Sequence, residues 1–531
     1  MKNNKIYLPI FLAIATAVGI FIGSNLNYQK KAALLFSANP QEQKIKRLID
    51  FIEYDYVDAV NTDSLLDGTI KNIVNKLDPH SVYIPAKEQA KIAEKMNGKF
   101  VGIGIQYRIV RDSLTVINTI PGGPSEKIGL KAGDRILMAN KDTLYGANIK
   151  NISITAKLKG TLNSVVNLKV FRKSTNETFD FAVVRGNVPI KSIDAAYLLK
   201  DDIGYIKLHN FTATSFTEFT KELIKLKSKG MKKLIFDLRG NTGGFIGVTT
   251  DIIDEFLEDE KLIVFTKNNK GKIEESFATE KGNFENGKVY VLIDEDSASA
   301  SEILAGALQD NDKGVIVGRR SFGKGLVQQD MKLGDGSSVR LTTARYYTPT
   351  GRSIQKPYKL NHKSEYYADD FQKRYLRGEL TSADSIQVID SLKFVTPKGK
   401  VVYGGGGIIP DVFVPIDTTS LFGNFHFTTM SDFVFNYVDN HRNEFKNDTI
   451  YSFMEGFDSD DKILTLYIKK IKTSFHYKEK NKEDIKHYLK AMFARELYDD
   501  NGFYQVLNKK DKVINKVLEM EAAQYSVDTG Q

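Results

Sequence analysis

The sequence predicts an α/β protein whose core is a largely parallel sheet, and residues 203–318 carry the pattern that predicts it. Short apolar runs with the composition of buried strands occur at 205–208, 233–237, 289–293 and 314–318. Residues 215–229 place apolar side chains at helical spacing and are followed by Gly230, a residue type that often ends helices. Strands that alternate with helices form βαβ units, so we expect parallel strands covered by helices.

Composition limits the chemistry available to this chain. Its 531 residues, 41% hydrophobic and 27% charged, exceed one ordinary domain, so we expect three or more folding units. Cysteine is absent, which excludes disulfides, thiolate catalysis and cysteine-ligated zinc. The net charge of +9 is modest and spread along the chain, which argues against nucleic acid as a partner. The seven histidines are scattered, and we expect neither a metal nor an organic cofactor.

The amino terminus has the pattern of an export signal or a membrane anchor. Two lysines precede an apolar run at 6–23, and no clear A-x-A cleavage site follows it. We therefore expect residues 1–27 to form an uncleaved anchor in a bacterial inner membrane, with the rest of the chain in the periplasm by the positive-inside rule. A cleaved signal peptide that leaves a soluble periplasmic or secreted protein is the alternative.

Residues 41–95 have helical spacing of apolar side chains, with Asp63 as the expected cap of the second helix. The segment LDPHSVY at 77–83 interrupts this pattern. His80 within it has no neighbouring cluster of ligand-type residues, so a structural role is the simpler interpretation.

Serines and a lysine stand at the two points of the expected core where chemistry is easiest to place. The run SASAS at 297–301 follows a strand and opens a helix, where unpaired backbone N–H groups favour developing negative charge. Lys324 lies between Gly323 and Gly325, and confinement there would make its amine easier to deprotonate, as a general base for a serine requires. Each feature alone has a plainer explanation. Ser299 with Glu302 is a helix capping box, and residues 318–324 approach a phosphate-binding loop but lack the hydroxyl after the lysine.

Taken together, SASASEI at 297–303 and FGKG at 322–325 resemble the carboxy-terminal processing, or tail-specific, serine peptidases. The resemblance implies that Ser299 is the nucleophile and Lys324 its base, 25 positions apart as in the family. It also implies that Asp310 or Gln328 orients the lysine.

A second match to this family is DLRGNTGG at 237–244. The resemblance implies that Gly243 or Gly244 supplies one backbone N–H to an oxyanion hole and Ala300 supplies the other, a role suited to donors fixed by a glycine-rich turn. A plain strand-to-helix turn with Asp237 paired to Arg239 is compatible with this. Asp296 departs from the family, which often has glycine there; because aspartate tolerates left-handed backbone, we expect the turn to survive.

Residues 96–187 resemble a PDZ domain, through GIGI at 102–105, PGGPS at 121–125 and LKAGDRIL at 130–137. Such domains bind a terminal carboxylate with loop N–H groups while the peptide adds to a sheet edge. The expected carboxylate loop comprises Gly102, Ile103, Gly104 and Ile105, and a helix near 152–158 forms the other wall.

The resemblance implies a crotonase- or Clp-protease-like α/β peptidase core at 188–417, with the PDZ domain inserted before it and helices at both ends of the chain. A long strand is expected at 338–347. Residues 356–400 form a charged insertion with a short helix near 385–392 and no assigned function. Residues 418–531 are helical and aromatic, which indicates helix packing, with docking or oligomerisation as the alternative. Family-like sequence spans 77–411.

The sequence therefore predicts a membrane-anchored, extracytoplasmic serine endopeptidase that binds unfolded or flexible protein C-termini and cleaves through an acyl-enzyme. Its expected partners are those C-termini and the membrane, with a homo-oligomer or an adaptor protein as further options. The main rival is an inactive PDZ scaffold or chaperone-like binder. A nucleotide hydrolase using residues 318–324 and an acyl hydrolase for esters or small amides are less favoured rivals.

Overall fold

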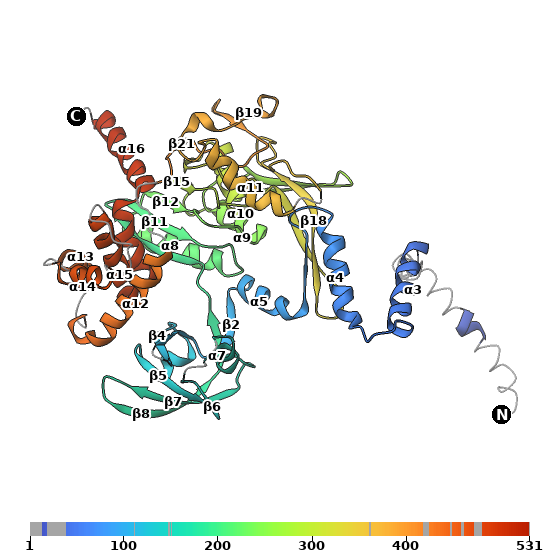
Figure 1. Ribbon diagram of the computed structural model, residues 1–531. Coiled ribbons are helices and arrows are strands. Elements are labelled where there is room, and N and C mark those ends of the chain that lie inside the picture. Colours follow the sequence, from blue (N-terminus) through green and yellow to red (C-terminus); the bar gives the residue numbers. More distant parts are fainter. Residues whose placement is uncertain are drawn as a thin grey trace, which may run out of the picture. The chain divides into compact units, whose positions relative to one another are not determined.

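The computed structural model describes residues 13–17, 39–110, 112–146, 149, 151–360, 363–417, 424–445, 449–457, 461–471 and 481–529. It divides into two compact units, Met1–Val74 and Asn75–Gln531. The second unit contains the sheets, the PDZ-like domain and the C-terminal helices (Figure 1).

Two helices make up most of the described part of the first unit. Helix α3 (Pro40–Tyr54) begins after Asn39, whose side chain accepts from the Gln41 N–H. Helix α4 (Thr62–Asn75) is preceded by Asn61, whose side chain accepts from the Ser64 N–H at 2.9 Å. The prediction of Asp63 as the cap is therefore wrong, because Asp63 already lies in the first turn. The anchor expected at 6–23 lies outside the described residues except for the helical stretch 13–17, and no described helix has the length and apolarity needed to cross a membrane.

The core of the second unit is a six-stranded sheet in the order β10-β11-β12-β15-β16-β21. Its strands β11, β12, β15, β16 and β21 pair in parallel, and β10 pairs antiparallel with β11. The largely parallel sheet predicted from the sequence is confirmed. The bounds are β10 (Ile193–Lys200), β11 (Ile203–Leu208), β12 (Lys233–Asp237), β15 (Lys288–Ile293), β16 (Gly314–Gly318) and β21 (Val412–Phe413).

Helices bury both faces of this sheet, as parallel sheets require. On one face lie α8 (Ser215–Ser228), α9 (Ile246–Asp254) and α10 (Ala300–Asp310), whose apolar side chains share one core with Leu234, Phe236 and Val291 (Figure 1). On the other face, Val513, Ile514 and Val517 of α16 (Lys512–Thr529) pack against Tyr205 and Tyr290.

A second, five-stranded sheet stands beside the core. It is ordered β1-β18-β13-β14, with β17 also paired to β18, and its pairings are antiparallel. The long strand expected at 338–347 is confirmed as β18 (Ser338–Tyr347). Strand β1 (Val82–Ile84) brings the segment after His80 next to β18, and β17 (Leu326–Lys332) carries Gln328. The remaining strands are β13 (Leu262–Asn268) and β14 (Ile273–Phe277).

The PDZ-like domain has its own sheet in the order β3-β4-β5-β7-β8, and β6 pairs with β5. Its core gathers Leu114, Ile136 and Val166 of the sheet with Ile154 and Leu158 of α7 (Asn151–Leu158), the helix that the sequence predicts. The bounds are β3 (Ile105–Val110), β4 (Ser113–Thr119), β5 (Asp134–Ala139), β6 (Asp142–Thr143), β7 (Val165–Arg172) and β8 (Glu177–Val184). Strands β2 (Lys99–Gly102) and β9 (Gly186–Pro189) pair with each other where the chain enters and leaves this domain, and α5 (Ala86–Met96) precedes β2.

The insertion differs from its prediction. Its helix is α11 (Lys363–Leu376), and the region expected to be helical near 385–392 holds only two single 3₁₀ turns, Ala383–Ser385 and Asp390–Leu392. The polar, turn-forming residues of that region favour isolated turns, whereas Tyr366 and Arg374 of α11 are anchored by buried contacts. A small hairpin, β19 (Lys393–Val395) with β20 (Val401–Tyr403), completes the insertion.

The C-terminal region is helical, as expected, and has a core of its own. Aromatic side chains dominate this core, with Tyr467, Phe493 and Phe453 among its buried members. Its helices are α12 (Asn424–Asn440), α13 (Ile450–Gly456), α14 (Lys462–Ile471) and α15 (Lys482–Leu507). Helix packing is therefore the structural reason for the aromatic spacing seen in the sequence.

Candidate active site

Ser299 stands at the N-terminus of α10 in a backbone conformation that few residues adopt. Its φ is +56° and its ψ is −113°, so the chain turns sharply between β15 and the helix. Strain of this kind persists only where surrounding contacts hold it, and such contacts often occur at reactive residues. The left-handed residue is Ser299 itself and not Asp296, whose φ is negative.

The two flanking serines have structural tasks that leave Ser299 as the accessible one. The Ser297 hydroxyl donates to the Leu238 carbonyl at 2.9 Å, and the Ser301 hydroxyl donates to the Asn241 carbonyl at 2.8 Å. Both serines are fully buried, whereas Ser299 is half-buried. These hydrogen bonds attach the start of α10 to the glycine-rich loop 238–244.

Glu302, one turn into α10, connects the serine loop with the lysine loop. Its carboxylate accepts from the N–H groups of Ser299 at 2.8 Å, Gly323 at 2.7 Å and Lys324 at 2.8 Å, and from the Ser321 hydroxyl at 2.5 Å. Glu302 is fully buried. Burial raises its pKa, against the opposing effect of these hydrogen bonds. One side chain thus sets the positions of both backbone segments that carry the expected dyad.

Tyr346 of β18 adds a second link between the same two loops. Its hydroxyl lies 2.7 Å from the Lys324 carbonyl oxygen and 3.1 Å from the Ser299 carbonyl oxygen. The tyrosine is fully buried, and its pKa is raised because burial disfavours the phenolate. The hydroxyl therefore remains a donor to these carbonyls.

Lys324 is held in a partly desolvated position, as the sequence predicts. Burial lowers the pKa of its amine to about 8, and the nearby positive charge of Arg340 acts in the same direction, while Glu302 and Asp78 oppose it. A lysine with this pKa is substantially neutral at mildly alkaline pH. It can then accept a proton, which an ordinary lysine at neutral pH cannot do.

Gln328 is the residue that holds the Lys324 amine. The amine lies 2.8 Å from Gln328 Oε1, and Gln328 Nε2 donates to the His80 carbonyl at 2.6 Å. The His80 ring packs edge-on against Tyr366 and Tyr367 of α11. Burial lowers the pKa of His80 to about 3, with the Lys324 charge adding to the effect, so the ring is neutral. His80 thus reaches the site through its backbone.

Asp310, the other residue expected near the lysine, is placed elsewhere. At the C-terminal end of α10 it forms an ion pair of 2.7 Å with Arg352, and both side chains are fully buried. It also accepts from the Thr350 hydroxyl at 2.7 Å. Among the described contacts of Asp310, none involves Lys324, so the geometry separates the two candidates.

Of the expected oxyanion donors, Gly243 and Ala300 lie beside Ser299, and Gly244 packs against Phe211. A β-carbon added to Gly243 would stand 2.8 Å from Ser299 Cβ and 2.9 Å from the Ala300 nitrogen, and one added to Gly244 would stand 2.0 Å from the Phe211 carbonyl oxygen. Only glycine therefore permits this approach. The Gly243 N–H donates to Asn241 Oδ1 at 2.8 Å, so this donor would have to exchange its partner to bind an oxyanion.

The expected carboxylate loop of the PDZ-like domain precedes an edge strand. Ile103 is buried, Gly104 has a φ of +78°, and Ile105 starts β3. Within the described sheet β3 pairs only with β4, on one of its two edges. Across from it, the Tyr107 hydroxyl lies 2.8 Å from the Thr155 hydroxyl of α7. The loop and the free edge are arranged as β-strand addition requires, and a peptide that enters between β3 and α7 would have to displace this hydrogen bond.

Sequence reasoning missed part of the site. Glu302 was visible only as a capping residue, and Tyr346 only as part of a strand. No sequence pattern indicated that α11 contacts the lysine loop. Its Arg374 donates to the Ser321 carbonyl, and its Tyr367 stacks on the Phe322 ring with centroids 5.9 Å apart. The described residues contain no group of three or more histidine, aspartate or glutamate side chains arranged to hold a metal ion.

Comparison with known families matches four segments of the chain. They are "Peptidase family S41" at residues 202–360, "PDZ domain" at 101–183, "Activating protease CtpB N-terminal domain" at 18–88 and a family of unknown function at 427–499.

Several curated proteins are similar over most of their length. The carboxy-terminal processing protease CtpB of Bacillus subtilis is 30% identical over 64% of this chain and 72% of its own. The carboxy-terminal-processing protease of Bartonella bacilliformis is 31% identical over 64% of this chain and 78% of its own. Among solved structures, a photosystem II D1 C-terminal processing protease is 23% identical over 70% of this chain and 86% of its own, with a TM-score of 0.35.

The site and the curated relatives together define a serine peptidase with a domain that binds protein C-termini. The chain belongs to peptidase family S41, the carboxy-terminal processing proteases, and carries a PDZ domain and a CtpB-like N-terminal domain.

Proposed function

We propose that this protease is an endopeptidase that first binds a flexible C-terminus on its PDZ domain and then cleaves the same chain upstream with a Ser299/Lys324 dyad. The observation that carries the proposal is the environment of Lys324. Its amine has a pKa of about 8, is hydrogen-bonded to Gln328, and belongs to a loop that shares the Glu302 carboxylate with Ser299. These are the properties of a base kept ready for a serine.

In the first half of the reaction Lys324, in its neutral form, accepts the proton of the Ser299 hydroxyl. The serine oxygen attacks the scissile carbonyl carbon, and the carbonyl oxygen becomes an oxyanion. The Ala300 N–H and the N–H of Gly243 or Gly244 stabilise that charge. To do so, the Gly243 N–H must exchange its acceptor, Asn241 Oδ1, for the oxyanion, so the second donor of the hole becomes available only as the oxyanion forms.

In the second half the tetrahedral intermediate expels the amine of the new chain, which takes the proton from Lys324. The acyl-enzyme ester that remains is attacked by water, with Lys324 again accepting a proton. The second tetrahedral intermediate then expels the Ser299 oxygen, which takes this proton back from Lys324 as the new carboxyl terminus leaves. Gln328 keeps the amine pointed at the site throughout, because its own amide is fixed to the His80 carbonyl. Each proton transfer of the cycle therefore passes through Lys324.

We also propose that residues 6–23 anchor the protease in a membrane with its catalytic part outside the cytoplasm. Support comes from the apolar run behind Lys2 and Lys5. Fractionation of cells followed by protease treatment of intact spheroplasts tests this. Recovery of an uncleaved, externally digestible protein in the membrane fraction is expected, and recovery in the cytosolic fraction would contradict it.

The test of the catalytic proposal is cleavage of an unfolded protein with an apolar C-terminus, followed by mass spectrometry. Ser299→Ala and Lys324→Ala should abolish cleavage, and Lys332→Ala, at the exposed end of β17, serves as the matched control. Amidation of the substrate C-terminus should weaken cleavage, because the PDZ domain loses the carboxylate it recognises. Equal cleavage by all variants would refute the dyad. Binding without cleavage in the unmodified protein would favour a scaffold.

A further inference from the structure

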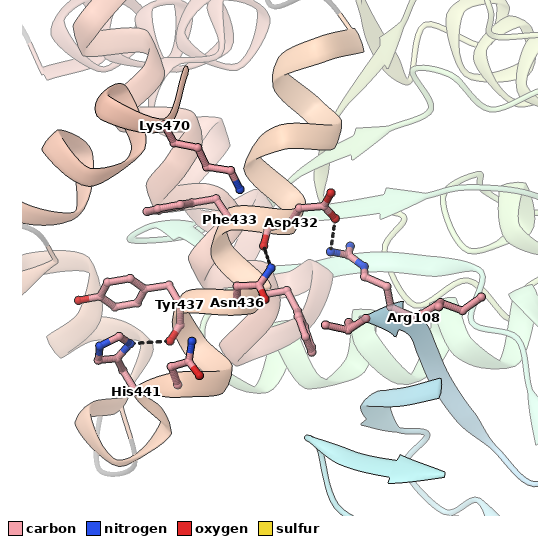
Figure 2. A pocket seen from close by; sticks show the side chains of 11 residues that line it. Arg108, Asp432, Phe433, Asn436, Tyr437, His441 and Lys470 are labelled. Carbon is pink, nitrogen blue, oxygen red and sulfur yellow. Dashed lines mark hydrogen bonds and ion pairs between the residues drawn. The ribbon is translucent and has the colours of Figure 1, made fainter. Parts of the chain in front are cut away.

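A pocket of about 540 Å³ lies between the PDZ domain and the C-terminal helices, away from Ser299 and Lys324. One side is formed by Arg108, Ile109 and Val110 at the end of β3. The other side is formed by the α12 residues Phe433, Phe435, Asn436, Tyr437 and Asn440, with His441 and Lys470 beyond them (Figure 2). Its volume is within the range of protein sites for small ligands and side chains.

Polar contacts hold the two sides of this pocket together. Arg108 donates to the Ser431 carbonyl at 2.9 Å and lies 3.3 Å from Asp432. Figure 2 shows the Arg108–Asp432 pair at the rim of the pocket. Arg135 of β5 forms a 2.6 Å ion pair with Asp439 of α12, and both side chains are largely buried. The pocket is therefore a defined surface that continues from β3 onto α12.

The direction of a bound substrate follows from the position of the carboxylate loop. The loop at 102–105 immediately precedes β3, so a C-terminus bound there lies at the beginning of that strand. The upstream residues of the substrate then run antiparallel to β3 toward Val110. Since β3 has six residues and extended chains advance at matching steps, it accompanies about six residues of the substrate. The pocket begins beside the last three residues of β3 and continues onto α12, so the next residues upstream leave the strand alongside it.

We infer that this pocket is a second binding site for the substrate, which receives residues about seven to ten positions before its C-terminus. The inference rests on the proposed capture of C-termini by the PDZ domain. It also assigns a role to the region that matches a family of unknown function, because the pocket residues of α12 and Lys470 lie within residues 427–499.

The lining indicates what kind of segment binds. Phe433 and Tyr437 offer aromatic surface, and the His441 ring stacks on Tyr437 with centroids 4.2 Å apart. Asn436 Nδ2 donates to the Asp432 carbonyl and Asn440 Oδ1 accepts from Lys173, so Asn436 Oδ1 and Asn440 Nδ2 are the amide atoms that suit the backbone groups of an extended chain. The ligand is therefore an extended, unfolded segment that carries an aromatic or long aliphatic side chain. A protease with this site would favour substrates whose unfolded tails exceed the PDZ groove in length.

The test compares two fluorescent peptides on the full chain carrying Ser299→Ala, which prevents cleavage. One peptide has the six C-terminal residues of an apolar tail, and the other has fourteen residues with phenylalanine at the ninth from the end. We expect the longer peptide to bind about tenfold more tightly, as burial of one large apolar side chain implies. Asn436→Trp, which fills the pocket, should remove this gain and leave the six-residue affinity unchanged.

Lys469→Ala is the control, since this neighbour of Lys470 is exposed and does not line the pocket. Equal affinity of the two peptides, or a gain that survives Asn436→Trp, would overturn the inference while leaving PDZ capture intact. Failure of both peptides to bind, or equal binding of amidated forms, would instead refute the capture on which the inference rests. A change of sedimentation coefficient in Asn436→Trp with unchanged peptide affinities would assign the pocket to self-association and overturn the inference too.

Discussion

Two regions of this protease join separate segments of the chain in opposite ways. At the dyad, Glu302 joins the Ser299 and Lys324 loops through buried hydrogen bonds to backbone N–H groups. Between the PDZ domain and α12, the contacts are side-chain ion pairs: Arg135–Asp439, which is largely buried, and Lys173–Asp439, whose lysine is exposed. Buried backbone contacts fix geometry, whereas partly solvated ion pairs weaken with salt. The first region is suited to precise chemistry and the second to adjustable substrate binding.

The largest effect should follow from Glu302→Gln. The amide keeps the volume but presents N–H groups where backbone N–H donors already point, so buried donors at both loops lose their acceptor. We expect kcat to fall about 10²-fold or more, with KM little changed and a lower melting temperature. Steady-state kinetics on a fluorogenic peptide measure this.

Glu295→Gln is the matched control, because Glu295 lies in the turn before α10 and pairs with Arg319. If Glu302→Gln kept full kcat, the rigid character assigned to the catalytic region would be wrong.

The second-largest effect on kcat should distinguish Gln328 from Asp310, the two residues expected to orient Lys324. Gln328→Ala removes the acceptor 2.8 Å from the amine, and we expect kcat to fall about tenfold to a hundredfold, part of the usual contribution of a general base. Gln329→Ala, its exposed neighbour on β17, should retain activity. A similar loss in both variants would indicate general damage to the strand.

Asp310→Asn should act on stability. It breaks an ion pair whose two side chains are fully buried, so the free energy of unfolding should fall by about 3 kcal/mol. Chemical denaturation gives this value, and the kcat of the protein that remains folded should be near normal. A loss of kcat with unchanged stability would contradict this prediction and indicate that Asp310 orients Lys324.

The smallest effect on activity should come from a substitution at the contact between the PDZ domain and α12. Burial would raise the pKa of Asp439, but its hydrogen bonds and charge interactions with Arg135 and Lys173 lower it overall, so it is ionised at neutral pH. Asp439→Asn should raise KM for long substrates a few-fold at low salt, and the difference should shrink partly in concentrated salt, because salt screens the pair with exposed Lys173 more than the buried pair with Arg135. Asp461→Asn, which affects a pair outside this contact, is the control. A salt-independent effect would contradict the comparison.

The features that could be predicted from the sequence are those that short, local sequence patterns specify. Alternating strands and helices predicted the parallel sheet, and the motifs around Ser299 and Lys324 predicted the family, both of which are confirmed. The PDZ domain was predicted from its glycine-rich loops, and the family comparison confirms it.

Features that depend on distant segments had no such pattern. The meeting of His80 with Gln328 requires a segment 248 positions away, and the contacts of Tyr366 and Arg374 depend on where α11 packs. Asp310 and Gln328 were equivalent in the sequence, because the choice between them depends on Arg352 reaching Asp310. The pocket beside β3 likewise forms only when α12 folds against the PDZ domain.

The measurement that most directly tests Lys324 as the general base is the rate of acylation as a function of pH, measured by single-turnover kinetics. Neutral Lys324 is the active form, so below its pKa of about 8 the rate should fall about tenfold per pH unit, and above it the rate should level off. Arg340→Gln removes a positive charge that lowers this pKa, so its profile should move to higher pH. A profile flat from pH 6 to about 9, or one that Arg340→Gln leaves in place, would contradict Lys324 as the base.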